Sequence, residues 1–172
     1  MIRTFLLAAA TFAVAPFAVA QDRKPGEDRK PAEKAYSDAE FVKMATQCSM
    51  LEVKLGKLAA EQSKSDDVKK LANTLVRDHQ GANEKLAAVA KELNIQLPTE
   101  IDAECKKCLE KFEAMKNDFN DKEYVTHVIE AHQKAIQWCK KASAQAQNQN
   151  LKDLADTMTR TLQTHLEMAK KI

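Results

Sequence analysis

The chain has few of the residues that break helices. Its 172 residues include 3 glycines and 4 prolines, and after residue 37 only Gly56, Gly81 and Pro98 remain. Glycine and proline are the residues that most disfavour a helix interior. Nearly all of residues 38–172 can therefore be helical, and this length suits one domain. The sequence predicts an all-α fold.

The chain has no large excess of either charge, and aromatic residues are scarce. The 27 basic residues are balanced by 25 acidic ones, for a formal net charge of +2, and aromatic residues make up 5% of the chain. A nucleic-acid-binding domain usually shows a basic stripe, whereas both signs are interspersed here. The sequence therefore predicts no nucleic-acid partner, and it names no protein partner.

The N-terminus has the pattern of an export signal. Residues 1–20 carry one basic residue, Arg3, followed by an uncharged apolar run that ends in Ala-Val-Ala. This pattern predicts a signal peptide cleaved after Ala20. A retained membrane anchor is less favoured, because the run is short and contains Pro16. We expect an exported protein, periplasmic or extracellular, with no membrane span after cleavage.

A charged leader follows the predicted signal peptide. Residues 21–37 hold nine charged residues together with prolines and a glycine, and they show no apolar periodicity. Such a segment has too little to bury to fold. We expect a disordered leader that contributes nothing to the core, followed by a bundle domain over residues 38–172.

The domain contains an internal repeat. At an offset of 83 residues, two segments match two others without a gap: 38–42 with 121–125, and 71–77 with 154–160. Chance could produce either match, but both at one offset indicate two homologous helical hairpins. The apolar periodicity predicts their long helices at residues 38–62, 68–93, 121–147 and 150–171.

The hairpins, residues 38–94 and 121–171, are joined by an unusually long connection. Residues 95–118 far exceed the two to eight that commonly join antiparallel neighbours, and a short helical stretch is expected around 103–115. This connection can run back along the bundle. The sequence therefore favours a ferritin-like four-helix bundle with a partly helical crossover over an up-down-up-down arrangement.

Each long helix has one ionisable residue in its apolar stripe: Glu52, His79, His132 and His165. With a rise of about 1.5 Å per residue, all four fall near the middle of the bundle. Ferritin-like bundles build metal sites from such convergent side chains. The ordinary alternative is a core histidine bonded to a carbonyl or a water, and a glutamate that reaches solvent.

The ligand types narrow the choice of metal. The Glu-x-x-His signature of di-iron bundles is absent, since Val76, Ile129 and Leu162 stand three residues before the histidines. One carboxylate and three imidazoles suit zinc or copper better than iron. His127 lies off the stripe, and we expect it at the surface.

Four cysteines in an exported chain make disulfides possible. Cys105 and Cys108 form a C-x-x-C in a helical segment, where a local disulfide or half of a metal clip fits equally well. Cys48 and Cys139 face the core and need no function as small buried thiols. The crossover topology places these two at similar levels, so we expect them to approach each other.

Several segments resemble the bacterial domain of unknown function 4142 family: residues 41–42, 50–59 and 77–83, with Tyr124, His132 and the His165-Leu166 pair. The most specific are Glu52-x-x-x-Gly56 and Asp78-His79. The resemblance covers about residues 38–172. It implies a ferritin-like fold behind a signal peptide, and no settled activity. Ala131 stands where the family is expected to have an acid, and Cys48 where a small residue is expected.

Two functions remain. The first is a non-enzymatic binding module of the cell envelope, connected with stress. The second is a transition-metal-binding or metal-dependent redox protein that uses Glu52, His79, His132 and His165, with zinc or copper favoured over iron. An enzyme is the third choice, because no Ser-His-Asp arrangement, phosphate loop or pair of catalytic acids can be placed.

Overall fold

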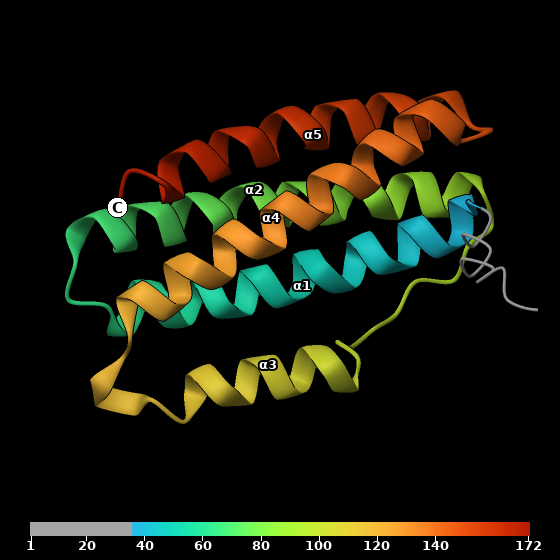
Figure 1. The fold of residues 1–172 in the computed structure, drawn as a ribbon. Helices are drawn as coiled ribbons and strands as arrows, with labels where there is room; N and C mark the ends of the chain where they lie inside the picture. Colours follow the sequence, from blue (N-terminus) through green and yellow to red (C-terminus); the bar gives the residue numbers. More distant parts are fainter. Residues whose placement is uncertain (1–35) are drawn as a thin grey trace, which may run out of the picture. The chain divides into compact units, whose positions relative to one another are not determined.

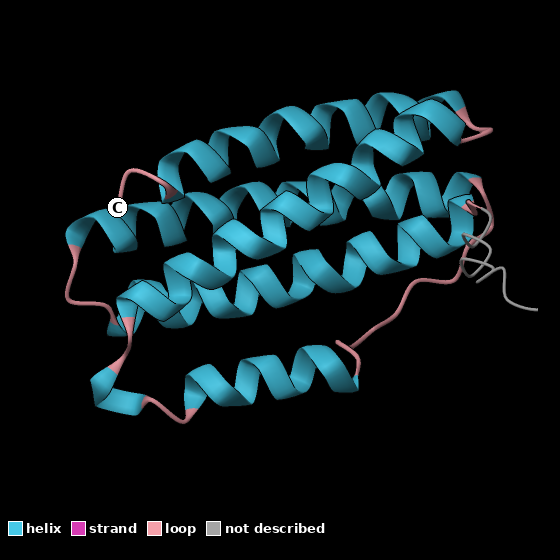
Figure 2. Cartoon of the chain, in the orientation of Figure 1, coloured by secondary structure: helices cyan, strands magenta, loops and turns pink. Residues whose placement is uncertain are grey.

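The computed structural model describes residues 36–172, and within this range the regular structure is entirely helical (Figure 2). The predicted all-α class is confirmed. The predicted signal peptide and nearly all of the predicted leader lie outside the described residues. No helix among residues 36–172 is long and apolar enough to cross a membrane.

Four long helices and two short ones follow each other along the chain: α1 (Asp38–Gln62), α2 (Asp66–Glu92), α3 (Ala103–Glu113), the 3₁₀ turn η1 (Lys116–Asp118), α4 (Asp121–Gln145) and α5 (Gln149–Ala169). The bounds of α1 are those predicted. α4 and α5 each end two residues before the predicted end, in a stretch where helix ends commonly fray.

Polar caps set where each long helix begins. Ser37, Ser65, Asn120 and Asn148 each accept a hydrogen bond from the backbone N–H three residues further on. Such a cap satisfies one of the N–H groups that a helix start leaves without a partner. The caps of α4 and α5 follow those of α1 and α2 by 83 residues, so the offset seen in the sequence is also the offset of the helix starts.

The long helices form a bundle of two hairpins (Figure 1). α1 packs against α2, and α4 against α5; the hairpins meet where α2 contacts α5 and α1 contacts α4. The connection after α2 runs back along the bundle, with α3 packed beside α1. As a result α4 begins at the same end as the α1–α2 turn, which is the crossover that the long connection predicted.

Two apolar clusters fill the interior. One includes Leu86 and Ile136, and the other includes Leu75 and Val128. On α2 and α4 the two clusters are separated by a buried histidine. On α5 the order along the chain is reversed, and His165 follows Leu162 of the first cluster and precedes Ala169 of the second. A thin polar layer therefore crosses the middle of the core.

Gly56 allows α1 and α2 to approach closely. A Cβ atom at this position would lie 2.7 Å from Val76 Cγ2 and 3.1 Å from the Ala72 carbonyl oxygen. Both distances are shorter than an ordinary carbon contact of about 3.5–4.0 Å. The spacing within the first hairpin therefore depends on the absence of a side chain, one helical turn from His79.

Candidate metal centre

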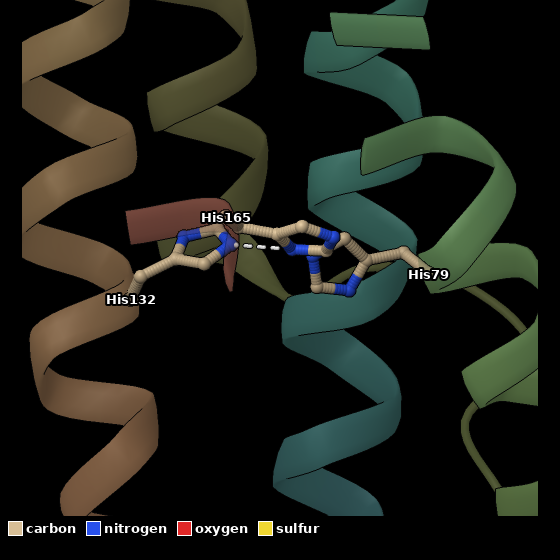
Figure 3. Close-up of side chains that lie close together, drawn as sticks. All are labelled: His79, His132 and His165. Carbon is tan, nitrogen blue, oxygen red and sulfur yellow. Dashed lines mark hydrogen bonds between the residues drawn. The ribbon is translucent and has the colours of Figure 1, made fainter. Parts of the chain in front are cut away.

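Three histidines meet in the bundle core, one each from α2, α4 and α5 (Figure 3). Their exposed fractions are 7% for His79 and 1% for both His132 and His165. The ring centroids are 5.3–5.6 Å apart, and one ring nitrogen from each lies within 4.8 Å of the others. Three of the four predicted ligands are thus neighbours.

Hydrogen-bond acceptors fix the protonation of two of these rings. His132 Nδ1 lies 2.9 Å from the Val128 carbonyl oxygen, which can only accept, so Nδ1 carries the hydrogen. His165 Nε2 lies 3.0 Å from Asp78 Oδ2. Although burial opposes it, hydrogen bonds from Arg77 and His165 hold the pKa of Asp78 below its ordinary value. The carboxylate is therefore ionised, and His165 Nε2 donates to it.

The inner nitrogens of the same two rings then have no hydrogen. A neutral imidazole carries one N–H, so His132 Nε2 and His165 Nδ1 both present lone pairs, and they face each other at 3.2 Å. Two facing lone pairs repel each other unless a cation or an added proton lies between them. Burial lowers the pKa of His132 to about 3, and it also lowers the pKa of His165 although Asp78 acts in the opposite direction. Both shifts disfavour an added proton, whereas a metal ion between the rings would satisfy both lone pairs.

His79 supplies a third available nitrogen. Its Nδ1 lies 3.3 Å from Ser49 Oγ, and its Nε2 is buried without a hydrogen-bond partner. Burial, with a smaller effect from the two neighbouring histidines, lowers the pKa of His79 to about 3. The ring is therefore neutral at pH 7, which is the form that binds metals.

The spacing agrees with a metal site for two nitrogens and needs a small closure for the third. Metal–nitrogen bonds of about 2.0 Å at a tetrahedral angle place two nitrogens about 3.3 Å apart. The pair formed by His132 and His165 is at 3.2 Å. Because no pair in the group exceeds 4.8 Å, bringing His79 onto a shared ion needs a movement on the order of 1 Å.

Glu52, the fourth predicted ligand, lies outside this group. Its Oε1 is 3.7 Å from His127 Nε2, and burial raises the pKa of Glu52 to about 8. The carboxylate beside the histidines is instead Asp78. The Asp78-His79 pair is visible in the sequence, but a role for Asp78 is not, because adjacent residues on a helix point in different directions and the contact with α5 depends on how the hairpins pack.

His127 is not the surface residue that we expected. Its side chain is 23% exposed, and its ring packs on Phe112 with the centroids 5.6 Å apart. Cys108 Sγ is 3.9 Å from its Nδ1. The prediction was wrong because α3 covers this part of α4, and the packing of a connecting helix cannot be inferred from periodicity within α4.

All four cysteines are free thiols in this structure. Burial raises the pKa of Cys48 to about 11 and of Cys139 to about 12, and Cys48 also contributes to the shift of Cys139. Cys48 has a similar smaller effect on Cys105 of α3. The pairing of Cys48 with Cys139, and of Cys105 with Cys108, remains a prediction.

Two cavities reach the histidines between different helices. One of about 290 Å³ lies between α2 and α5 and is lined by His79, His165 and Met158, among others. The second, of about 200 Å³, is lined by His79, His132 and Glu52 and extends to Trp138. The three-histidine cluster is therefore accessible to a small ion.

Comparison with known proteins places the chain in a sequence family and a fold. A family model described as Domain of unknown function (DUF4142) matches residues 23–172. No curated protein is detectably similar in sequence. Solved structures with the same fold include "CopM in the Cu(I)-bound form", with a TM-score of 0.67, 17% identity, and coverage of 80% of this chain and 95% of that one. They also include "CopM in the Cu(II)-bound form", with a TM-score of 0.63, 18% identity, and coverage of 79% and 96%.

Proposed function

The chain belongs to the DUF4142 family, whose description assigns no function, and from that premise we propose that it is a non-enzymatic helical bundle that binds a copper ion through His79, His132 and His165. One observation carries this proposal: two neutral rings present bare nitrogens to each other at 3.2 Å in the core, with an acceptor behind each. A metal ion satisfies all of these atoms together.

Copper is favoured over the other ions by the donor set. Imidazole suits copper and zinc, and copper(II) binds a given nitrogen site more strongly than zinc. Met158 lines the cavity beside His79 and His165, and a thioether is a ligand for copper(I). The structures of CopM, with the same fold, are described as Cu(I)-, Cu(II)- and silver-bound. Iron is disfavoured, since among residues 36–172 no pair of carboxylates joins the three histidines.

Asp78 is a positioning residue in this site. By accepting a hydrogen bond from His165 Nε2 at 3.0 Å, it directs His165 Nδ1 into the core and increases the basicity of the ring. A histidine that binds a metal commonly donates its other N–H to a carboxylate in this way. The Val128 carbonyl does the same for His132.

The rest of the chain indicates the fold that holds the site and the compartment in which the protein acts. We propose that the domain is a ferritin-like bundle produced by internal duplication; the crossover connection and the 83-residue offset of the helix starts support this. The N-terminal sequence supports export to the periplasm or beyond, where the protein would act as a binding module of the envelope.

Copper binding by the reduced protein tests the proposal. Copper(I) is titrated anaerobically against a chromophoric chelator, and X-ray absorption identifies the ligand atoms. With His127→Ala as the background, which keeps the three core histidines, we expect nitrogen ligation that is lost when His79, His132 or His165 is also replaced by alanine. Nitrogen ligation that survives all three of these further replacements would overturn the site. A protein that competes for zinc but not for copper would overturn the choice of metal.

A further inference from the structure

A second row of ligand-type side chains lies outside the three-histidine cluster. It runs from Cys108 on α3 through His127 on α4 to Glu52 on α1. Cys108 Sγ is 3.9 Å from His127 Nδ1, and His127 Nε2 is 3.7 Å from Glu52 Oε1. None of these three residues takes part in the copper site proposed above.

The distance between Cys108 Sγ and His127 Nδ1 suits two ligands of one metal ion. Bonds of about 2.3 Å to sulfur and about 2.0 Å to nitrogen place the two ligand atoms about 3.5 Å apart at a tetrahedral angle and about 4.3 Å apart on opposite sides of an ion. The observed 3.9 Å between Cys108 Sγ and His127 Nδ1 falls between these limits. It is also long for a direct hydrogen bond from the thiol.

Glu52 stands where a metal-bound histidine needs an acceptor. If His127 Nδ1 binds an ion, its Nε2 must carry the hydrogen, and Glu52 Oε1 faces that nitrogen. The Glu52 side chain is 5% exposed, and its Oε2 is buried without a hydrogen-bond partner, as is His127 Nε2. The order of groups is the one found behind His165, where Asp78 accepts from Nε2 at 3.0 Å and Nδ1 is left available; the contact of Glu52 with His127 Nε2 is longer, at 3.7 Å.

We propose that Cys108 Sγ and His127 Nδ1 form a second metal site, for a soft monovalent ion such as copper(I), with Glu52 as the residue that positions His127. A thiolate and an imidazole are ligands that copper(I) accepts in low coordination numbers. The single negative charge of the thiolate balances the single positive charge of the ion in this half-buried place.

Loading this site exchanges a proton for the ion. The S–H bond of Cys108 breaks, a sulfur–copper bond forms, and the proton leaves to solvent, with no change in oxidation state. Burial raises the pKa of the Cys108 thiol, so the thiol is protonated before the metal arrives and binding is accompanied by proton release.

Counting copper(I) ions retained against a strong chelator tests the proposal. We expect two ions per reduced chain, and one in Cys108→Ser or His127→Gln. The matched control is Cys105→Ser, one turn earlier on α3, which should keep both ions. Glu52→Gln should lower the affinity of one site about 10-fold to 100-fold.

Alkylation of the thiols separates this site from the three-histidine site. Bound copper(I) should slow alkylation of Cys108, mapped by mass spectrometry, in the wild type and in His132→Ala but not in His127→Gln. A single ion lost in His132→Ala, with Cys108 alkylated at an unchanged rate, would overturn the second site and leave the first standing. A chain that binds a single ion, loses it in Cys108→Ser and keeps it in His132→Ala would overturn the three-histidine site and leave the second site standing. Retention of both ions by His127→Gln would exclude His127 as a ligand.

Discussion

His132 Nε2 and His165 Nδ1 face each other at 3.2 Å without a hydrogen between them. The cause lies on the far side of each ring, where the Val128 carbonyl and the Asp78 carboxylate each take the only N–H of a neutral imidazole. In the proposed metal site, two of the three ligands would thus be oriented by groups that do not touch the ion, and the ion would separate two lone pairs that otherwise face each other.

Replacement of Asp78 by asparagine should weaken copper binding. The amide has a weaker acceptor and can also donate, so it no longer fixes the hydrogen on His165 Nε2. We expect a loss of affinity at the three-histidine site of about 10-fold to 100-fold, measured by chelator competition. Asp67→Asn, on the exposed face of the same helix, should leave the affinity unchanged; an equal loss in both variants would point to a general effect of charge.

The core histidines of the metal-free protein should remain neutral in mild acid. Burial lowers the pKa of His79 and His132 to about 3, so their ring signals in NMR spectra should not titrate between pH 8 and pH 5. The unfolded chain takes up these protons near pH 6.5 and the native state does not. Stability should therefore fall as the pH drops below 6.5, by at most about 1.4 kcal/mol per pH unit for each ring. Ring signals with a midpoint near pH 6.5 would contradict this.

Glu52 should act in the opposite direction. Burial raises its pKa from 4.5 to about 8, so between these values the native state holds a proton that the unfolded state has lost. The stability of the metal-free protein should decrease as the pH rises from 4.5 to 8. Glu52→Gln should remove this decrease, as measured by urea unfolding at pH 6 and pH 8. Parallel curves for the two proteins would show that Glu52 is ionised in the fold.

Alanine at the two helical glycines should have opposite effects. At Gly56 the added Cβ would meet Val76 Cγ2 at 2.7 Å, whereas at Gly81 it would meet nothing within 4 Å. We expect Gly56→Ala to lower the free energy of unfolding by about 1–3 kcal/mol through overpacking. Gly81→Ala should raise it by about 0.5–1 kcal/mol, because alanine favours the helix. Thermal unfolding of the metal-free proteins measures both.

Much of this architecture was predictable because it depends on local signals. The scarcity of proline and glycine and the serine and asparagine caps specify the helix starts. The length of the connection indicated the crossover. The helical stripes identified His79, His132 and His165 as core residues, because a position in a stripe determines which way a side chain faces.

The partners of these side chains were less predictable. Asp78 reaches His165 from the other hairpin, and the packing of α3 leaves His127 half-buried beside Glu52. Both contacts depend on how hairpins and connection dock, which periodicity within one helix does not encode. For the same reason, the apolar stripe of α1 places Glu52 in the interior but does not show that His127 is its neighbour.

The three core histidines are divided between the two hairpins. His79 belongs to the first hairpin, whereas His132 and His165 belong to the second. An ion held by all three acts as a cross-link that closes a long loop of chain and binds only the folded state, so it reduces the population of opened molecules by mass action. Because proteases cleave opened molecules, the metal-free chain should be degraded faster than the loaded one, and the amount of protein would then follow the supply of copper.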